Sequence, residues 1–252
     1  MQVVGYETAG EDSPATLQLA EDGQVSRETL TPGTSIDFGL ARRHCAGSID
    51  GDTHVSCSND ETPYCAEHTD EWPCARCSGN CAMPIEACHE EHVIYLAAFA
   101  PNTFKVGVTR SWRLDTRLRE QGADRAATIE VVQNGRIARS IESNIATDLT
   151  DRVRIDEKIA GLHRSVDRSA WETVLGEYQA QEDFAFEYGL DLQRHPIKAT
   201  LLSGSIRGSK GRILVLDRGG STYAVDMRAL LGFELAPTGD GERHQSRLGV
   251  FE

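Results

Sequence analysis

The chain has 252 residues, of which 39% are hydrophobic, and carries a formal net charge of −13 at pH 7. No apolar run approaches the ~20 residues that a membrane-spanning helix requires, and the N-terminus lacks the basic start of a signal peptide. These features argue against a helical membrane protein. We expect a soluble, cytoplasmic protein of one or two structural units.

The charge is distributed unevenly along the chain. Residues 1–92 contain 17 acidic and 4 basic residues, whereas residues 93–140 contain 4 acidic and 8 basic residues. The basic residues comprise 22 arginines and 4 lysines, against 39 acidic residues. Scarce lysine and abundant carboxylate are expected of a halophilic chain, because concentrated salt screens repulsion between like charges. The total charge therefore does not exclude nucleic acid as a partner, since one segment is basic.

The first 40 residues predict short strands separated by turns, at Gln2–Glu7, Thr16–Ala20 and Val25–Leu30. Residues 41–91 show almost no apolar periodicity. Such a segment cannot bury enough apolar surface to fold without a bound metal.

All seven cysteines fall within residues 45–88. An odd number of cysteines without an export signal argues against disulfides, and their clustering with histidines indicates metal ligands. Two residues between ligands, as in Cys65-x-x-His68 and Cys74-x-x-Cys77, allow both side chains to reach one ion. We predict up to two structural zinc ions, one bound by Cys45, Cys57, Cys65 and His68 and the other by Cys74, Cys77, Cys81 and Cys88.

Two alternatives to this zinc assignment remain open. Any one ligand could be replaced by a neighbouring histidine: His44, His54, His89 or His92. Reduced buried cysteines or a redox pair would also account for the cluster.

The central segment predicts a strand over 92–100, a second strand over 104–108, a helix over 111–121 that Gly122 ends, and a third strand over 128–132. We expect Trp112 and either Leu114 or Leu118 to be the apolar contacts of that helix. Apolar residues every four positions predict a buried helical stripe, formed by Ile137, Ile141, Ile145 and Leu149.

A further helical tract is expected over 156–181, with Trp171 and Leu175 among its apolar residues. Four short strands follow, over 201–206, 211–217, 222–226 and 233–236, separated by glycine-rich turns. The predicted organisation is a β segment (1–40), a zinc-binding segment (41–91), a central α+β domain with a helical extension (92–182) and a small C-terminal β segment (195–240).

Several short motifs occur in a distinctive order in the central segment. Val93-Ile94-Tyr95, Lys105-Val106-Gly107 and Arg117-Leu118 stand in succession. Together they resemble the GIY-YIG nuclease superfamily, and more closely the DUF2797 family within it. The closer resemblance rests on His92-Val93-Ile94-Tyr95-Leu96, Lys105-Val106-Gly107-Val108-Thr109-Arg110, Glu120-Gln121-Gly122-Ala123 and Gly208-Ser209-Lys210-Gly211-Arg212.

This resemblance implies a small mixed or antiparallel three-stranded sheet with helices, and cleavage of nucleic-acid phosphodiesters with Mg²⁺ or Mn²⁺. Carried over to this chain, Tyr95 would assist the attacking water, Arg117 would hold the scissile phosphate and Glu142 would bind the divalent metal. Lys105 stands where the second motif has a tyrosine, and it can pair with a phosphate. The chemistry is consistent, because a guanidinium and a carboxylate-held cation both stabilise charge on phosphate oxygens.

Four basic residues are candidates for contacts to DNA or RNA: Lys105, Arg110, Arg113 and Arg119. They could instead be counter-charges for the acidic zinc-binding segment. Two other functions remain open. Lys105 and Gln121 stand where the superfamily often has tyrosine and histidine, which favours a catalytically inactive nucleic-acid binding module. The acidic residues 1–92 favour a zinc-dependent protein–protein adaptor.

Overall fold

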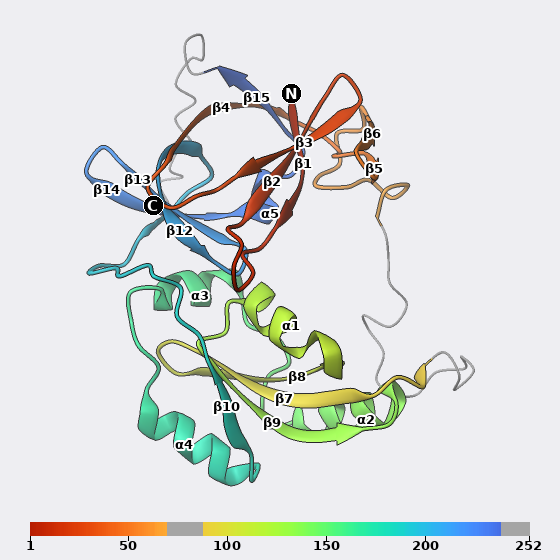
Figure 1. Cartoon of the computed structure of the whole chain (residues 1–252), viewed down its shortest axis with the longest axis vertical. Coiled ribbons are helices and arrows are strands. Elements are labelled where there is room, and N and C mark those ends of the chain that lie inside the picture. The colour runs from red at the N-terminus through yellow and green to blue at the C-terminus, as the bar shows by residue number, and fades with distance from the viewer. Residues whose placement is uncertain (70–87, 238–252) are drawn as a thin grey trace, which may run out of the picture.

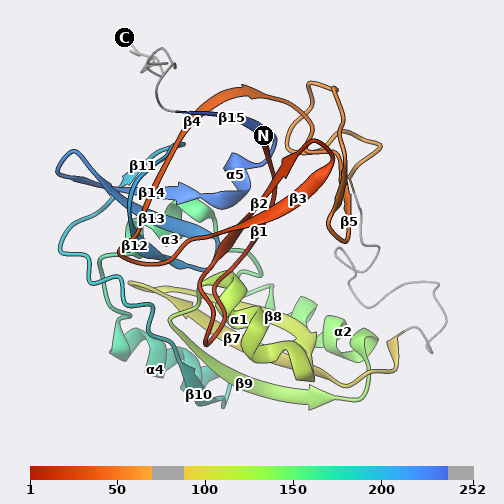
Figure 2. The ribbon, with the colours of Figure 1, turned by 45° about the horizontal axis from the view of Figure 1, so that its top comes forward.

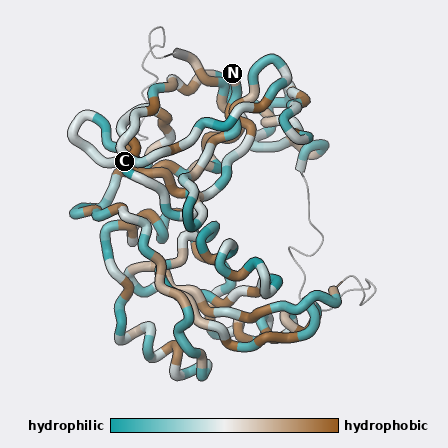
Figure 3. The backbone as a smooth tube through the Cα atoms, viewed as in Figure 1, coloured by the Kyte–Doolittle hydropathy of each residue, from teal (hydrophilic) through white to brown (hydrophobic). Residues whose placement is uncertain are grey.

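The computed structural model describes residues 1–69 and 88–237, which form two lobes (Figure 1). One lobe is built on a large sheet, and the other on a smaller sheet accompanied by helices α1–α4; a view turned by 45° shows the same division (Figure 2). This part of the chain is mostly strand with few helices, which confirms the predicted α+β class. Hydrophobic stretches gather along the strands of both sheets (Figure 3).

Among the described residues, eleven strands make up the large sheet, in the order β11-β14-β13-β12-β4-β15-β1-β2-β3-β6-β5. β11 and β14 pair in parallel, and the other neighbouring strands of this sheet pair antiparallel in the described chain. The strands are β1 (Gln2–Glu7), β2 (Thr16–Glu21), β3 (Gln24–Thr29), β4 (Ser35–Arg43), β5 (Ser48–Asp50), β6 (Thr53–Val55), β11 (Ile197–Lys198), β12 (Leu202–Lys210), β13 (Ile213–Arg218), β14 (Ser221–Asp226) and β15 (Phe233–Pro237).

The two ends of the described chain share this large sheet. β4 pairs with both β12 and β15, and β15 also pairs with β1. Val3 and Leu17 from the first strands belong to the same buried cluster as Leu202 and Leu214 from the last strands. The N- and C-terminal β segments, which the sequence separates by more than 150 residues, are therefore one structural unit rather than two.

The smaller sheet is antiparallel, and its order in the described chain is β10-β9-β7-β8. Its strands are β7 (His92–Phe99), β8 (Thr103–Arg110), β9 (Arg125–Val132) and β10 (Gln181–Ala185). The first three were predicted, but the sheet has a fourth strand, β10, which begins where the expected helical tract ends and was not predicted. The superfamily's specific three-stranded sheet is therefore not confirmed.

Different helices cover the two faces of the smaller sheet. Tyr95, Ala97 and Phe99 alternate along β7 and pack with Leu118 of α1, whereas Ile94 packs with α2 on the opposite face. In the β7–β8 ladder, Tyr95 lies opposite Gly107 and Ala97 lies opposite Lys105. Lys105 and Gly107 therefore belong to the α1 face of the sheet.

The helices of the described chain are α1 (Leu114–Gln121), α2 (Gly135–Ile145), α3 (Ile155–Gly161), α4 (Arg168–Glu177) and α5 (Met227–Leu230), with a 3₁₀ turn η3 (Ser111–Arg113) before α1. Gly122 ends α1 as predicted, in a left-handed conformation with φ of 69°. Asn134 caps α2, since its side chain accepts hydrogen bonds from two backbone N–H groups of the first turn.

Three expectations for the helices are corrected. Trp112 is 71% exposed because it lies in η3, ahead of α1, while Leu118 is the buried residue. Ile137 is 47% exposed, because Ala138 takes the buried position in the first turn of α2. The expected helix over 156–181 is two helices, and Asp167 caps the second through the backbone N–H of Ala170.

Within the described ranges, no helix has the length and apolar character that crossing a bilayer requires.

Candidate functional site

Four predicted zinc ligands come together beside the large sheet. The ligand atoms of Cys45, Cys57, Cys65 and His68 all lie within 4.8 Å of one another. His68 Nδ1 lies 3.2 Å from the Cys65 sulfur and 3.5 Å from the Cys45 sulfur. A tetrahedral ion with bonds of ~2.0–2.3 Å needs ligand atoms at about these separations, so this cluster could hold a zinc ion.

Backbone hydrogen bonds favour the thiolate form of Cys45, which is the form that binds a metal. Burial raises the pKa of the Cys45 thiol, but the backbone N–H groups of Cys65 and Gly47 donate to its sulfur at 3.3 and 3.4 Å and leave the net pKa below its ordinary value. The Gln2 side chain donates to the Cys45 carbonyl at 3.2 Å and to that of Gly232 at 3.1 Å. The cluster is thereby tied to both β1 and the loop before β15.

The predicted second zinc site lies mostly outside the described residues, which include only Cys88 of its four ligands. The described cysteines are Cys45, Cys57, Cys65 and Cys88, and the three in the cluster are free of disulfide bonds. Of the alternative ligands, His54 donates through Nε2 to the Ala46 carbonyl at 2.8 Å, and His44 donates through Nδ1 to the Cys57 carbonyl at 2.8 Å. Both therefore support the loop around the cluster through its backbone.

A second site is built around Tyr95, whose ring is buried between β7 and α1. The side chain of Gln121 donates a hydrogen bond to the Tyr95 hydroxyl at 2.6 Å. Burial raises the pKa of Tyr95, and the hydrogen bond from Gln121 and the charge of Arg117 only partly offset this. Tyr95 is therefore protonated at neutral pH, and its O–H can donate a hydrogen bond.

Lys105 on β8 lies on the same face of the sheet and is 8% exposed. Its ammonium donates to the carbonyl of Asp151 at 2.8 Å. Burial lowers the pKa of Lys105 to about 8, with a further decrease from Arg117 that Glu142 and Asp151 oppose. A lysine with such a pKa can exchange its proton near neutral pH.

Arg117 and Glu142 complete this group from two different helices. The charges of both residues influence the pKa values of Tyr95 and Lys105. Arg117 of α1 pairs with Glu120 at 3.2 Å and is about half exposed. Glu142 of α2 is 12% exposed and pairs with Arg139 at 2.6 Å. Its carboxylate is a ligand type that Mg²⁺ and Mn²⁺ accept.

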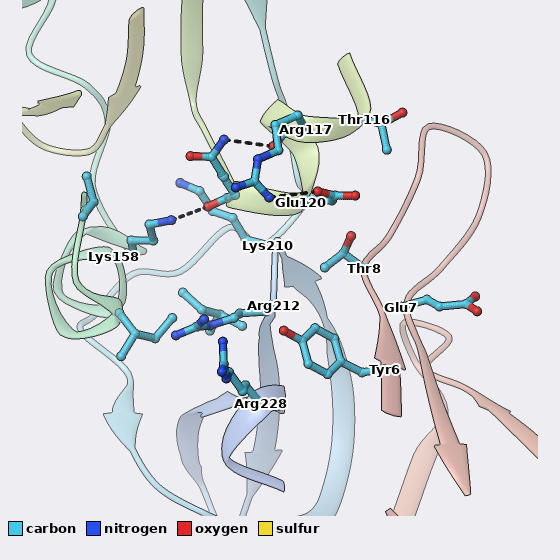
Figure 4. Close-up of a pocket in the computed structure, with 14 residues that line it drawn as sticks. Tyr6, Glu7, Thr8, Thr116, Arg117, Glu120, Lys158, Lys210, Arg212 and Arg228 are labelled. Atoms are coloured by element: carbon cyan, nitrogen blue, oxygen red, sulfur yellow. Dashed lines mark hydrogen bonds and ion pairs between the residues drawn. The ribbon is translucent and has the colours of Figure 1, made fainter. Parts of the chain in front are cut away.

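A cleft of about 640 Å³ opens between the two lobes next to this group (Figure 4). Its walls come from β1, α1, α3, the β12–β13 turn and α5. Arg117 and Gln121 line it, whereas Tyr95, Lys105 and Glu142 do not. The lining side chains include five cations and two carboxylates: Arg117, Lys158, Lys210, Arg212 and Arg228, with Glu7 and Glu120.

Two motifs that lie about ninety residues apart in the sequence meet at this cleft. A methyl group on Gly122 would lie 3.1 Å from the backbone nitrogen of Gly211, and one on Gly211 would lie 2.7 Å from that of Gly122. Glycine at both positions therefore allows the end of α1 to approach the β12–β13 turn. The same contact brings Lys210 and Arg212 beside Arg117, which explains why both motifs belong to one site.

The basic residues that line the cleft differ from the predicted nucleic-acid contacts. Arg110, Arg113 and Arg119 each form an ion pair, with Glu90, Glu120 and Asp115 respectively, and Lys105 is buried. None of these four lines the cleft. Sequence reasoning did not select four of the lining cations: Lys158, Lys210, Arg212 and Arg228. The late Lys210-Gly211-Arg212 motif carried a signal for two of them, whereas Lys158 and Arg228 had none.

The geometry thus defines an α+β protein with a Cys/His cluster and a basic cleft between two sheets. The family described as "Protein of unknown function (DUF2797)" matches residues 72–235, and the chain belongs to this family. No curated protein and no solved structure gives a significant match.

Proposed function

We propose that this protein is a metal-dependent endonuclease of the GIY-YIG type, which cleaves nucleic-acid phosphodiesters and carries structural zinc. The observation that supports it most strongly is that the charges of Arg117 and Glu142, on two helices, both influence the pKa values of Tyr95 and Lys105, on two strands. These residue types match the needs of phosphodiester cleavage: a cation for the phosphate, a carboxylate for a metal and a group that exchanges protons.

Each residue has a role that its surroundings favour. Arg117 is the exposed cation of the group, and its guanidinium can release Glu120 and bind the scissile phosphate in a bidentate manner. Tyr95 stays protonated and donates a hydrogen bond that orients the attacking water. Lys105, with a pKa of about 8, is suited to accept the proton from that water once it is itself deprotonated.

Glu142 would hold the Mg²⁺ or Mn²⁺, in exchange for its pairing with Arg139. A bound divalent cation would neutralise negative charge on the phosphate and leaving oxygens. The zinc-binding cluster lies outside this group and would serve stability, because it ties residues 45–68 to the large sheet.

The test is a cleavage screen with duplex, branched and single-stranded DNA and RNA, at high salt, with Mg²⁺ or Mn²⁺. We expect metal-dependent cleavage of at least one substrate by the wild type, reduced by at least about a hundredfold in Arg117→Ala. The enzymatic proposal is contradicted if the wild type cleaves none of these substrates, or if Arg117→Ala cleaves as fast as the wild type.

A second candidate is a nucleic-acid binding module without turnover. It is favoured by the burial of Tyr95 and Lys105, which are 1% and 8% exposed. Metal-independent binding that the double variant Lys105→Ala/Arg117→Ala abolishes, with no cleavage of any bound substrate, would select this candidate.

A further inference from the structure

Two cations face the cleft from opposite lobes without an acidic partner. Lys158 belongs to α3 and Arg228 to α5. Across the described ranges, neither side chain forms an ion pair, whereas three other cations of the lining do: Arg117 with Glu120, Lys210 with Asp124 and Arg212 with Asp226. Among the lining cations of the described chain, Lys158 and Arg228 are thus the two whose charge no carboxylate neutralises.

The surroundings of Lys158 show that the cleft has excess positive charge. Its ammonium donates to the Gln121 carbonyl at 2.7 Å and lies 4.4 Å from the centre of the Phe99 ring. Burial lowers the pKa of Lys158 to about 7, and the charges of Lys105, Arg212, Arg117 and Lys210 contribute to the decrease. A bound anion would relieve this repulsion, and that relief would contribute to its affinity.

Tyr6 adds a hydrogen-bond donor from the end of β1. Its hydroxyl points into the cleft, toward Arg212 and Arg228 (Figure 4). Burial raises the pKa of Tyr6, and the charges of Arg212 and Arg228 oppose the rise. The group therefore retains its proton at neutral pH. Phosphate oxygens accept hydrogen bonds from such hydroxyls as well as from guanidinium and ammonium groups.

We infer that the cleft between the lobes binds phosphate groups through Lys158 and Arg228, with Tyr6 as a further donor. Its volume of about 640 Å³ is in the range of ligand-binding clefts. Because this inference rests on the proposed function, the phosphates are those of the nucleic-acid strand, next to the phosphate that Arg117 binds. The large sheet then supplies part of the nucleic-acid site, although the nuclease-like motifs centre on the smaller sheet.

The first test measures binding of fluorescein-labelled 12-nucleotide single-stranded DNA and RNA by fluorescence anisotropy over a range of salt. Arg228→Gln and Lys158→Met should each weaken binding roughly tenfold and lower the salt slope by about one unit. Arg218→Gln is the matched control, because Arg218 is likewise an exposed arginine of the large-sheet lobe but does not line the cleft. It should bind as the wild type does, and circular dichroism should show every variant folded.

The second test distinguishes phosphates of a nucleic-acid strand from those of a small phosphorylated ligand. If the wild type binds or cleaves oligonucleotides and both cleft variants match it, the inference is overturned while the proposed function stands. If the wild type neither binds nor cleaves them, the proposed function fails, and inorganic pyrophosphate decides on the cleft. If pyrophosphate raises the Tm of the wild type and of Arg218→Gln but not that of Arg228→Gln, the cleft is a phosphate site for a small phosphorylated ligand. If pyrophosphate does not raise the Tm of the wild type, the phosphate site is overturned.

Discussion

Gly107 lies directly opposite Tyr95 in the β7–β8 ladder, and a methyl group on residue 107 would lie 2.5 Å from the Tyr95 hydroxyl oxygen. The tyrosine ring thus occupies space that exists only because residue 107 has no side chain. Two motifs that the sequence places twelve positions apart are therefore a single packing unit, in which β8 sets the position of the tyrosine on β7.

Replacing Gly107 with alanine should displace the Tyr95 ring. We expect Gly107→Ala to destabilise the protein by about 1–3 kcal/mol, the usual cost of overpacking, and to reduce cleavage. Gly176→Ala is the control, since a methyl group there meets nothing within 4 Å and alanine is favoured within α4. Urea unfolding of both variants measures the difference. Equal stability of Gly107→Ala and wild type would contradict the packing argument.

The hydroxyl of Tyr95 should matter more for cleavage than for folding. Tyr95→Phe removes one hydrogen bond with Gln121, which is worth about 1 kcal/mol, but leaves the ring in place. Under the proposed function, the rate of cleavage should fall by about a hundredfold. Tyr178→Phe serves as control, because Tyr178 packs on the opposite face of the sheet. A cleavage rate unchanged by Tyr95→Phe would remove Tyr95 from the proposed mechanism.

The sequence predicted local features well and long-range pairing poorly. Alternation and turn residues located β7, β8 and β9, and ligand spacing brought Cys45, Cys57, Cys65 and His68 together. No local pattern could show that β4 pairs with β12 and β15, because that register depends on residues far apart in the chain.

The same limit applies to the cleft. Arg117 was selected because a motif surrounds it, whereas Lys158 and Arg228 stand in segments without one. Long-range contacts bring them to one cavity, namely the approach of Gly122 to Gly211 and the packing of α3 on β13 and β14. Conversely, Arg110 and Arg113 looked available in the sequence, but ion pairs with Glu90 and Glu120 occupy them.

Metal analysis should find zinc at the cluster of Cys45, Cys57, Cys65 and His68. Cys45→Ser should lose one zinc per chain and lower Tm, because removing a structural metal exposes a loop with little apolar surface of its own. Cys88→Ser tests the second predicted site separately, and it should lose the other zinc without affecting the first. A Cys45→Ser protein with the zinc content and Tm of the wild type would contradict the metal assignment.

Lys158 should make stability depend on pH. Its pKa is about 7 in the folded protein and 10.5 as the ordinary value. Between these values the unfolded chain holds a proton that the folded protein has released, so the free energy of unfolding should increase as the pH rises above 7. Below pH 7 both states are protonated, and the full cost of burying the charge is present.

This dependence can be isolated with lysine variants. Urea unfolding at pH 7, 8 and 9 should give a smaller increase for Lys158→Met than for the wild type, since the titrating group is absent. Lys198→Met, which removes an exposed lysine paired with Asp156, should keep the wild-type increase. The idea fails if Lys158→Met shows the same increase as the wild type.

The central claim is that Tyr95, Lys105, Arg117 and Glu142 form one metal-dependent centre for phosphodiester cleavage. The most direct measurement is the rate of Mn²⁺-dependent cleavage by wild type and Glu142→Gln, with Glu130→Gln, an exposed glutamate on β9, as the matched control. We predict a loss of about a hundredfold or more in Glu142→Gln at every Mn²⁺ concentration, and a wild-type rate in Glu130→Gln. Cleavage by Glu142→Gln at the wild-type rate, or a wild type without metal-dependent cleavage, would contradict the account.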